Sequence, residues 1–209
     1  ATALAMTAPN DITMTGRIRA LGDNAIASGD NVLLNGGSVE SNGAVSIAAG
    51  TDGTGAIDIN KATELGNAIH TSQNVNITAA DDITVAGSVR ADARLVLDSI
   101  NGKVNVIGGV LSTGGMLNIA TNDTLTIAGK MFGGVGVGLS TINDVVFNGG
   151  SLTSNGAMSI AAGTDGTGTI DLGEEATGGY TIDTATALAM TAPNDITMTG
   201  RIRALGDNA

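Results

Sequence analysis

The side chains that could carry out catalysis are few in this chain of 209 residues, and the sequence keeps them apart. Hydrolysis of a glycosidic bond needs two carboxyl groups that face each other across the substrate. Asp58 and Asp171 occupy equivalent outward positions on short predicted strands. The residues expected beside them on the same face carry neither a second carboxylate nor a base: Leu33 and Thr84 beside Asp58, and Val146 and Thr197 beside Asp171. We therefore expect no catalytic residue and no enzymatic activity.

A histidine-based site also lacks the residues it would need. His70 is the only histidine, and cysteine is absent. A catalytic triad or a zinc site requires several such groups held together. We expect His70 to be a solvated surface side chain that points outward beside an insertion.

Asparagine and aspartate gather at one predicted corner. An Asn/Asp pair precedes the second strand of most units, at residues 10–11, 30–31, 81–82, 143–144 and 194–195. Stacked carboxylate and amide oxygens could bind Ca²⁺, as could Asp52 or Asp165 in the two TDGTG segments. However, the GGxGxDxux nonapeptide of calcium-binding β-rolls is absent. We favour hydrogen bonding to the turn backbone, with calcium as the alternative, and we expect no cofactor.

Six of the nine basic residues are predicted to lie on one outward face. This face could bind an anionic glycan or pack against acidic corners of a neighbouring rod; the simpler alternative, which we favour, is pairing with Glu40 or Asp183 on adjacent units. The net charge of −11 argues against nucleic acid or an anionic membrane as the main partner. The six residues are Arg17, Arg19, Arg90, Lys130, Arg201 and Arg203.

The elements that position these side chains are short strands. Segments such as 11–18 and 82–89 alternate apolar and polar residues, which is typical of a strand with one buried face. Aligned in this way, the chain gives nine units of three strands, with five inward positions in each unit. Of these 45 positions 44 are apolar, and Asn24 is the exception. With 42% hydrophobic but 1% aromatic residues, the interior must be narrow and regular.

The units follow each other at a nearly constant interval. First strands start about 20 residues apart, and the interval is longer only in the third and eighth units, which carry insertions. One such unit cannot bury its apolar face, but stacked units can. We therefore predict an all-β parallel β-solenoid of about nine rungs, each a turn of three strands and about 20 residues. The predicted first strands start at Leu4, Asn24, Val45, Val75, Leu95, Leu117, Val137, Met158 and Leu188.

Glycines and insertions mark the predicted corners. In units without a long second insertion, a glycine follows the second strand, where we expect a sharp corner with positive φ. Insertions occur at the second corner of the third and eighth units, as Lys61–Ala68 and Gly173–Thr181, and we expect both to be surface loops. The corner glycines are Gly16, Gly36, Gly87, Gly108, Gly129, Gly149 and Gly200.

Two internal repeats fit this count of rungs. The sequence of residues 1–25 returns unchanged at residues 185–209, which is eight rungs later. A looser repeat relates Asn35–Asp58 to Asn148–Asp171, with 20 of 24 positions identical. We predict that residues 1–184 form one eight-rung unit and that residues 185–209 begin the next copy in the same solenoid. The sequence has no capping segment at either end and no run long enough to span a membrane.

The rungs resemble a known family. The pattern of ALAMTAPNDITMTGRIRA and VNITAADDITVAGSVRA, with GGSVESNG between rungs, resembles the repeat region of filamentous-haemagglutinin-like adhesins. These are large bacterial surface proteins exported by two-partner secretion. The resemblance implies a right-handed parallel β-helix, an extracellular rod on the cell surface, and a role in adhesion, aggregation or biofilm. The partners that it implies are neighbouring copies of the same repeat, or glycans and proteins of a host or an extracellular matrix.

Two other functions remain as alternatives. Short subunits could join end to end into an extracellular filament through their open strand edges. A β-helix that binds or cleaves carbohydrate is the third, but it would require acids and aromatic rings on one face. The only aromatic residues are Phe132, Phe147 and Tyr180.

Overall fold

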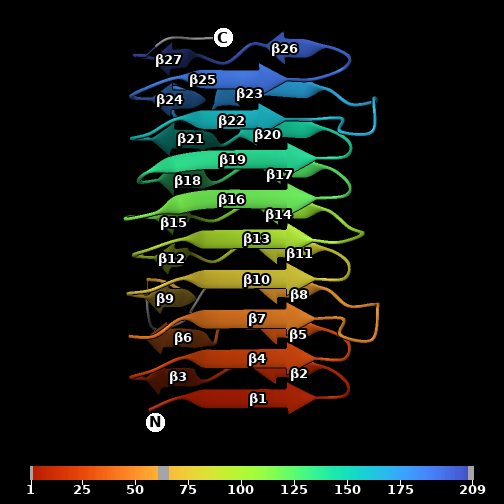
Figure 1. Cartoon of the computed structure of the whole chain (residues 1–209), viewed down its shortest axis with the longest axis vertical. Coiled ribbons are helices and arrows are strands. Elements are labelled where there is room, and N and C mark those ends of the chain that lie inside the picture. Colours follow the sequence, from red (N-terminus) through yellow and green to blue (C-terminus); the bar gives the residue numbers. More distant parts are fainter. Residues whose placement is uncertain (1, 61–65, 207–209) are drawn as a thin grey trace.

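The computed structural model describes residues 2–60 and 66–206, and these form a single column of stacked rungs (Figure 1). Its 27 strands lie in three parallel sheets of nine strands each, and the described residues contain no helix. In Figure 1 the front strands run from left to right, and the chain returns behind them as it climbs, so the coil is right-handed. The predicted β-solenoid is confirmed, with about 21 residues per rung.

Each sheet collects one strand from every rung, in the order of the chain. The first sheet contains β1 (Leu4–Ala8), β4 (Asn24–Ser28), β7 (Val45–Ala49), β10 (Val75–Ala79), β13 (Leu95–Ser99), β16 (Met116–Thr121), β19 (Gly136–Thr141), β22 (Met158–Ala161) and β25 (Leu188–Thr191). The second contains β2 (Ile12–Met14), β5 (Val32–Leu34), β8 (Ile57–Ile59), β11 (Ile83–Val85), β14 (Val104–Val106), β17 (Leu125–Ile127), β20 (Val145–Gly149), β23 (Ile170–Glu175) and β26 (Ile196–Met198). The third contains β3 (Arg17–Ala20), β6 (Ser38–Ser41), β9 (Ile69–Thr71), β12 (Val89–Ala91), β15 (Val110–Ser112), β18 (Lys130–Gly133), β21 (Ser151–Ser154), β24 (Ile182–Thr184) and β27 (Ile202–Ala204). Seven of the nine first strands start where predicted, and β16 and β19 start one residue earlier.

The core consists of five columns of inward side chains. Val75, for example, is aligned with Val45 on one side and with Leu95 on the other, and all three are fully buried. In the second to eighth rungs every predicted inward position is buried. Asn24 is buried as well, and neither atom of its side-chain amide has a hydrogen-bond partner among the described residues.

Buried serine and threonine hydroxyls form a second link between rungs, which was not predicted from the sequence. Most of them lie at the ends of strands and donate to a corner carbonyl of the preceding rung. Ser99 Oγ donates to the carbonyl of Asp81 at 2.6 Å, and Thr184 Oγ1 to that of Gly156 at 2.9 Å. Because the carbonyls at corners lie outside the strand ladders, these hydroxyls satisfy groups that burial would otherwise leave unpaired.

The prediction of positive φ is wrong for most corner glycines. Only Gly36 and Gly149 have it, at 77° and 83°. The other corner glycines have ordinary φ, and the stacking of rungs explains several of them. A Cβ atom on Gly129 would lie 1.8 Å from the carbonyl oxygen of Gly108, and one on Gly108 2.0 Å from that of Gly87. At these positions the corner admits only glycine because successive backbones approach closely.

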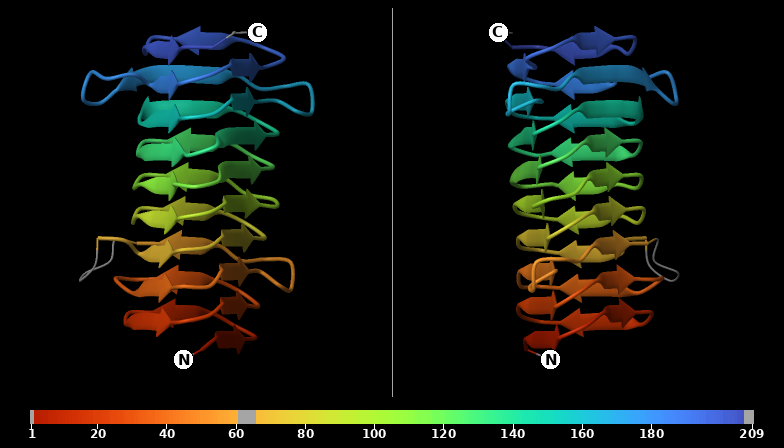
Figure 2. Two further views of the ribbon diagram at one scale, coloured as in Figure 1. Left: turned by 60° about the vertical axis from the view of Figure 1, so that its left-hand side comes forward. Right: turned by 90° about the vertical axis from the view of Figure 1, so that its right-hand side faces the viewer.

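The TDGTG corners and the insertion of the eighth rung project from the column without breaking it (Figure 2). The two TDGTG corners, near residues 50–55 and 163–168, project on the same side. The insertion predicted at Gly173–Thr181 is shorter than expected, because Gly173–Glu175 extend β23 and the ladder is irregular between Phe147 and Gly149. Of the insertion Lys61–Ala68, residues 61–65 lie outside the described residues, as do residues 1 and 207–209 of the terminal repeats.

Candidate functional site

The six basic residues lie along the outward face of the third sheet, as predicted, but they do not form one cluster. Arg17 and Arg19 lie on β3 and Arg203 on β27, so these three are at opposite ends of the sheet, with Arg201 directly before β27. Arg90 on β12 and Lys130 on β18 stand singly between them. The face therefore presents separate basic positions along the rod rather than one continuous anionic-ligand site.

At the β3 end, both arginines contact one acidic residue of the next rung. Arg17 forms an ion pair with Glu40, and Arg19 Nε lies 3.8 Å from Glu40 Oε2. The hydrogen bond from Arg17 holds the pKa of Glu40 below its usual range. The pairing with Glu40 that the sequence suggested is therefore present.

In the middle of the sheet, Arg90 pairs with an acid that sequence reasoning missed. Arg90 Nε donates to Asp92 Oδ1 at 3.0 Å, and Thr113 Oγ1 donates to the same oxygen at 3.1 Å. Burial by itself would raise the pKa of Asp92, but these hydrogen bonds outweigh it and the pKa is lowered. A signal was present in the sequence, because Arg90 and Asp92 are two residues apart and thus on the same face of an extended chain.

His70 points outward, as predicted, but it is only partly solvated. Its side chain is 40% exposed, and Nε2 is buried 4.0 Å from Asp92 Oδ2 with no hydrogen bond among the described residues. His70 is thus a surface side chain, as predicted, and Glu40 and Arg90 flank it in register on the adjacent strands.

At the β27 end, the arginines contact the rung below them. Arg203 Nε donates to Asp183 Oδ1 at 2.8 Å, and Arg201 Nη1 donates to the carbonyl of Gly178 at 3.2 Å. Both guanidinium groups lie 4.8 Å from the centre of the Tyr180 ring, which is a cation–π distance. The Tyr180 ring is thus already engaged by two cations, and this weakens its case as a sugar-stacking platform.

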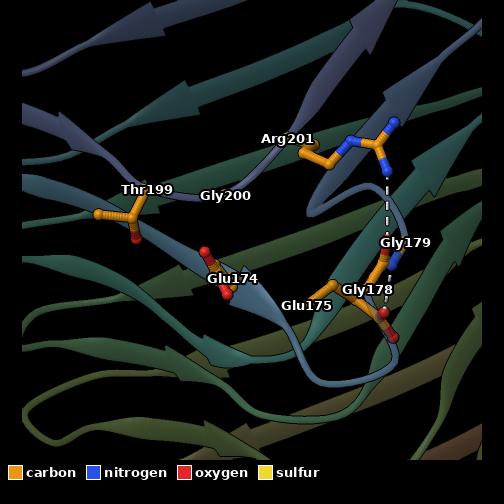
Figure 3. Close-up of a pocket in the computed structure, with 7 residues that line it drawn as sticks. All are labelled: Glu174, Glu175, Gly178, Gly179, Thr199, Gly200 and Arg201. Atoms are coloured by element: carbon orange, nitrogen blue, oxygen red, sulfur yellow. Dashed lines mark hydrogen bonds between the residues drawn. The ribbon is translucent and has the colours of Figure 1, made fainter.

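A pocket of about 160 Å³ lies beside these contacts, between the insertion of the eighth rung and the ninth rung (Figure 3). Glu175 holds the insertion closed: its Oε2 accepts from the amides of Thr177 and Gly179, both at 2.9 Å, and from the Thr177 hydroxyl at 2.6 Å. The Thr177 hydroxyl and the Gly179 amide hold the pKa of Glu175 below its usual range. The Glu175 carboxylate is therefore committed to the loop backbone. The pocket is lined by Glu174, Glu175, Gly178, Gly179, Thr199, Gly200 and Arg201.

The two carboxylates considered for hydrolysis have the neighbours that the sequence predicts. Asp58 on β8 is aligned with Leu33 and Thr84. Asp171 on β23 is aligned with Val146 and Thr197. The structure therefore does not bring a second acid beside either of them on this sheet.

The acidic corners bind backbone amides across rungs. Asp11 Oδ1 accepts from the amide of Asn31 at 3.0 Å, and Asp82 Oδ1 from that of Lys103 at 2.7 Å. Asp165 closes its own loop by accepting from the Thr167 amide at 2.9 Å. The predicted role in hydrogen bonding the turns is therefore present. Within residues 2–60 and 66–206, no three His, Asp or Glu side chains form a group that could hold a metal ion.

Comparisons of the chain with protein-family models, with curated proteins and with solved structures found no match. No helix in the described part of the chain is long and apolar enough to cross a membrane.

Proposed function

We propose that this chain is a structural repeat segment of a large secreted bacterial surface adhesin or extracellular fibre, in which a rigid rod provides reach and surface display. The observation that carries the proposal is the return of the sequence of residues 1–25 after eight rungs. Leu4 and Leu188 occupy the same core column at opposite ends of the first sheet. Because the repeated residues return to the same core column, adding further repeats would lengthen the same rod by whole numbers of rungs.

The ladders supply the stiffness that such a rod needs. Each strand of the second to eighth rungs pairs with a strand on both sides. Bending the rod would stretch ladders in at least one of three sheets, and removing one rung would expose two new edges. Support for an extracellular location and for adhesion comes from the resemblance to filamentous-haemagglutinin-like repeats.

The basic face has a smaller part in the proposal. Arg17, Arg19, Arg90 and Arg203 each have an acidic partner within the chain. Charges that are already paired attract an anionic glycan less strongly than free ones. Adhesion would therefore rest on other parts of the rod surface or on segments attached to it.

Assembly of short subunits into a filament is the second candidate, because β1–β3 and β25–β27 are the edge strands of all three sheets. Edge strands pair readily with other chains.

The mass of the native polypeptide after full denaturation tests both candidates. A mass many times the 20.5 kDa of these residues would support the one-chain adhesin, whereas a mass close to 20.5 kDa would support the filament.

Labelling of intact cells with a reagent that does not cross membranes tests the location. Protection of the protein from that reagent until the cells are lysed would overturn both candidates.

A further inference from the structure

Each strand of the third sheet contributes one outward side chain to a column that runs along the rod; these strands are labelled on the left of Figure 1. Register pairing continues through the whole sheet, from Arg19 on β3 to Arg203 on β27. Every side chain of this column is half-buried or exposed. The column is thus an accessible face of the rod.

The middle of this column is apolar. Leu111 on β15 and Phe132 on β18, in the fifth and sixth rungs, are register partners, and both side chains are half-buried. Ile107 and Val135 lie at the corners before β15 and after β18, and they are 57% and 58% exposed. An exposed apolar patch with a charged rim is typical of a protein–protein contact.

Toward both ends the column carries charges, and their order is complementary when a second rod lies antiparallel on this face. A two-fold axis level with the gap between the fifth and sixth rungs sets the third rung opposite the eighth and the second opposite the ninth. His70 then faces the partner's Asp183, and an imidazole N–H can donate to a carboxylate. Glu40 faces the partner's Arg203.

Charge and apolar contact select this alignment over its neighbours. Parallel rods in the same register would set Glu40 opposite the partner's Glu40, and like charges across an interface are unfavourable. An antiparallel shift by one rung sets Glu40 opposite the partner's Asp183, which is again unfavourable. The opposite shift sets Leu111 opposite the partner's Thr153, so the apolar pair is lost.

We propose that two copies of this chain associate side by side and antiparallel through the outward faces of their third sheets. Leu111 packs on the partner's Phe132 at the centre, and Arg90 lies opposite the partner's Thr153, which carries no charge. Each contact occurs twice because of the two-fold axis. The inference goes beyond the proposed function, since rods can pair in this way whether they are one long chain or a filament of subunits.

The ion pairs within each chain are compatible with this contact. The side chains of Glu40 and Arg203 remain 33% and 47% exposed. In the dimer, Asp183, Arg203, the partner's Glu40 and the partner's Arg17 alternate in sign along one network. Facing sheets lie about 10 Å apart, a distance that a glutamate and an arginine side chain can bridge together.

The size of the face fits a dimer of moderate affinity. Eight facing rungs at about 4.8 Å each, with about five residues across at about 3.3 Å each, give about 600 Å² per copy. The two copies together then bury about 1,200 Å², which is the lower end of the range for stable interfaces.

Sedimentation equilibrium of the present chain tests the association. We expect a mass that approaches twice 20.5 kDa at about 100 μM chain. Phe132→Glu should raise the dissociation constant at least about tenfold, because the two-fold axis brings two charges into the apolar centre. Val96→Glu is the matched control, since Val96 is a half-buried outward residue of the first sheet with Asn76 and Asn118 beside it, and we expect a change within about twofold.

A double-mutant cycle tests the alignment. Glu40 on β6 and Arg203 on β27 are far apart on the third sheet of one chain, so only contact between copies can couple them. We expect Glu40→Ala and Arg203→Ala each to raise the dissociation constant at least about fivefold, and the double variant to raise it about as much as one of them. Lys130→Ala replaces Arg203→Ala in the control cycle, because Lys130 is a basic residue of the same face that does not meet Glu40. There the two effects should multiply.

Three outcomes would overturn the proposal: a single-chain mass up to about 100 μM, association that survives Phe132→Glu, or effects that multiply in the cycle of Glu40 and Arg203. Association that survives Phe132→Glu would place the contact on another surface, such as the open strand edges. A native polypeptide with a mass close to 20.5 kDa would overturn the one-chain adhesin without changing the result for this dimer. The failure of the side-by-side contact and the failure of the proposed function are thus distinguishable.

Discussion

The side chains that join successive rungs are mostly short and polar. Ser99 and Thr184 bind corner carbonyls, and Asp11 and Asp82 bind corner amides of the next rung. Each such bond contributes about 1 kcal/mol, and at the buried Ser99 and Thr184 the loss of one partner also leaves a buried group unpaired. Asn24 is the opposite case, since its buried amide has no hydrogen-bond partner among the described residues.

Replacement of Asn24 should stabilise the fold. In its column Asn24 is aligned with Leu4 and Val45, so an apolar side chain fits the site. We expect Asn24→Val to raise the free energy of unfolding by about 1–2 kcal/mol, because an unpaired amide no longer has to be buried. Urea unfolding measures this change. Asn76→Val on the outward face of β10 is the control, with an expected change within about 0.5 kcal/mol. A loss of stability in Asn24→Val would contradict the burial of an unpaired amide.

Acid should destabilise the insertion of the eighth rung. Hydrogen bonds from Thr177 and Gly179 lower the pKa of Glu175 from its ordinary value of 4.5. The unfolded chain therefore binds the proton more readily, and the contribution of Glu175 is present above pH 4.5 and lost as the pH falls through the lower folded value. We expect Tm to be level from pH 7 to about 5 and to fall below about pH 4.5, with a smaller fall in Glu175→Gln. An equal fall in that variant would show that Glu175 is not involved.

The strands themselves are only three to six residues long, so the corners decide how rungs stack. Glycine at the second corner lets the backbone of one rung approach that of the next. The insertions leave the ladder of the third sheet in register, since β9 and β24 both pair on each side. Regular stacking of the rungs therefore depends on the geometry of the corners between strands.

Gly129→Ala and Gly16→Ala form a matched pair that tests this condition. A Cβ atom on Gly129 would lie 1.8 Å from the carbonyl oxygen of Gly108, whereas one on Gly16 would meet nothing within 4 Å. Neither glycine has positive φ, so alanine is allowed by the backbone at both positions. We expect Gly129→Ala to lower the free energy of unfolding by at least about 2 kcal/mol, and Gly16→Ala to lower it by less than about 0.5 kcal/mol. Thermal unfolding measures both changes. Equal losses of stability in the two variants would show that close stacking of the rungs is not the reason for glycine at position 129.

The whole molecule is a column in which each rung contacts mainly its neighbours. Its stability is therefore expected to be a sum over rungs and over the interfaces between them. A column of this kind can change length by one rung without a change in the core. The two ends differ from the interior because they have a partner on one side only within the described residues.

Removal of one complete rung should preserve the fold. Deletion of residues 95–116 joins Arg94 to Leu117, so that β10 meets β16 with its core columns aligned. We expect the deletion variant to keep its β-sheet circular dichroism and to unfold at a slightly lower temperature, with a rod shorter by about 4.8 Å. Deletion of residues 95–105 is the control, and we expect it to lose the fold because the core columns no longer align. Folding of both variants would refute the rung assignment.

The sequence alone determined the solenoid, its three strands per rung and nearly all of its core. These follow from alternation along the chain and from the interval between units, as at Val75, Ile77 and Leu95, and both are properties that consecutive residues carry. Only the tertiary structure decided which side chains bind each other across rungs. Arg90 binds Asp92, Ser99 binds the Asp81 carbonyl, and Gly129 is required by an approach to Gly108 rather than by its φ. Such contacts depend on rotamers and on ångström distances between neighbouring backbones, which a pattern of residue types does not contain.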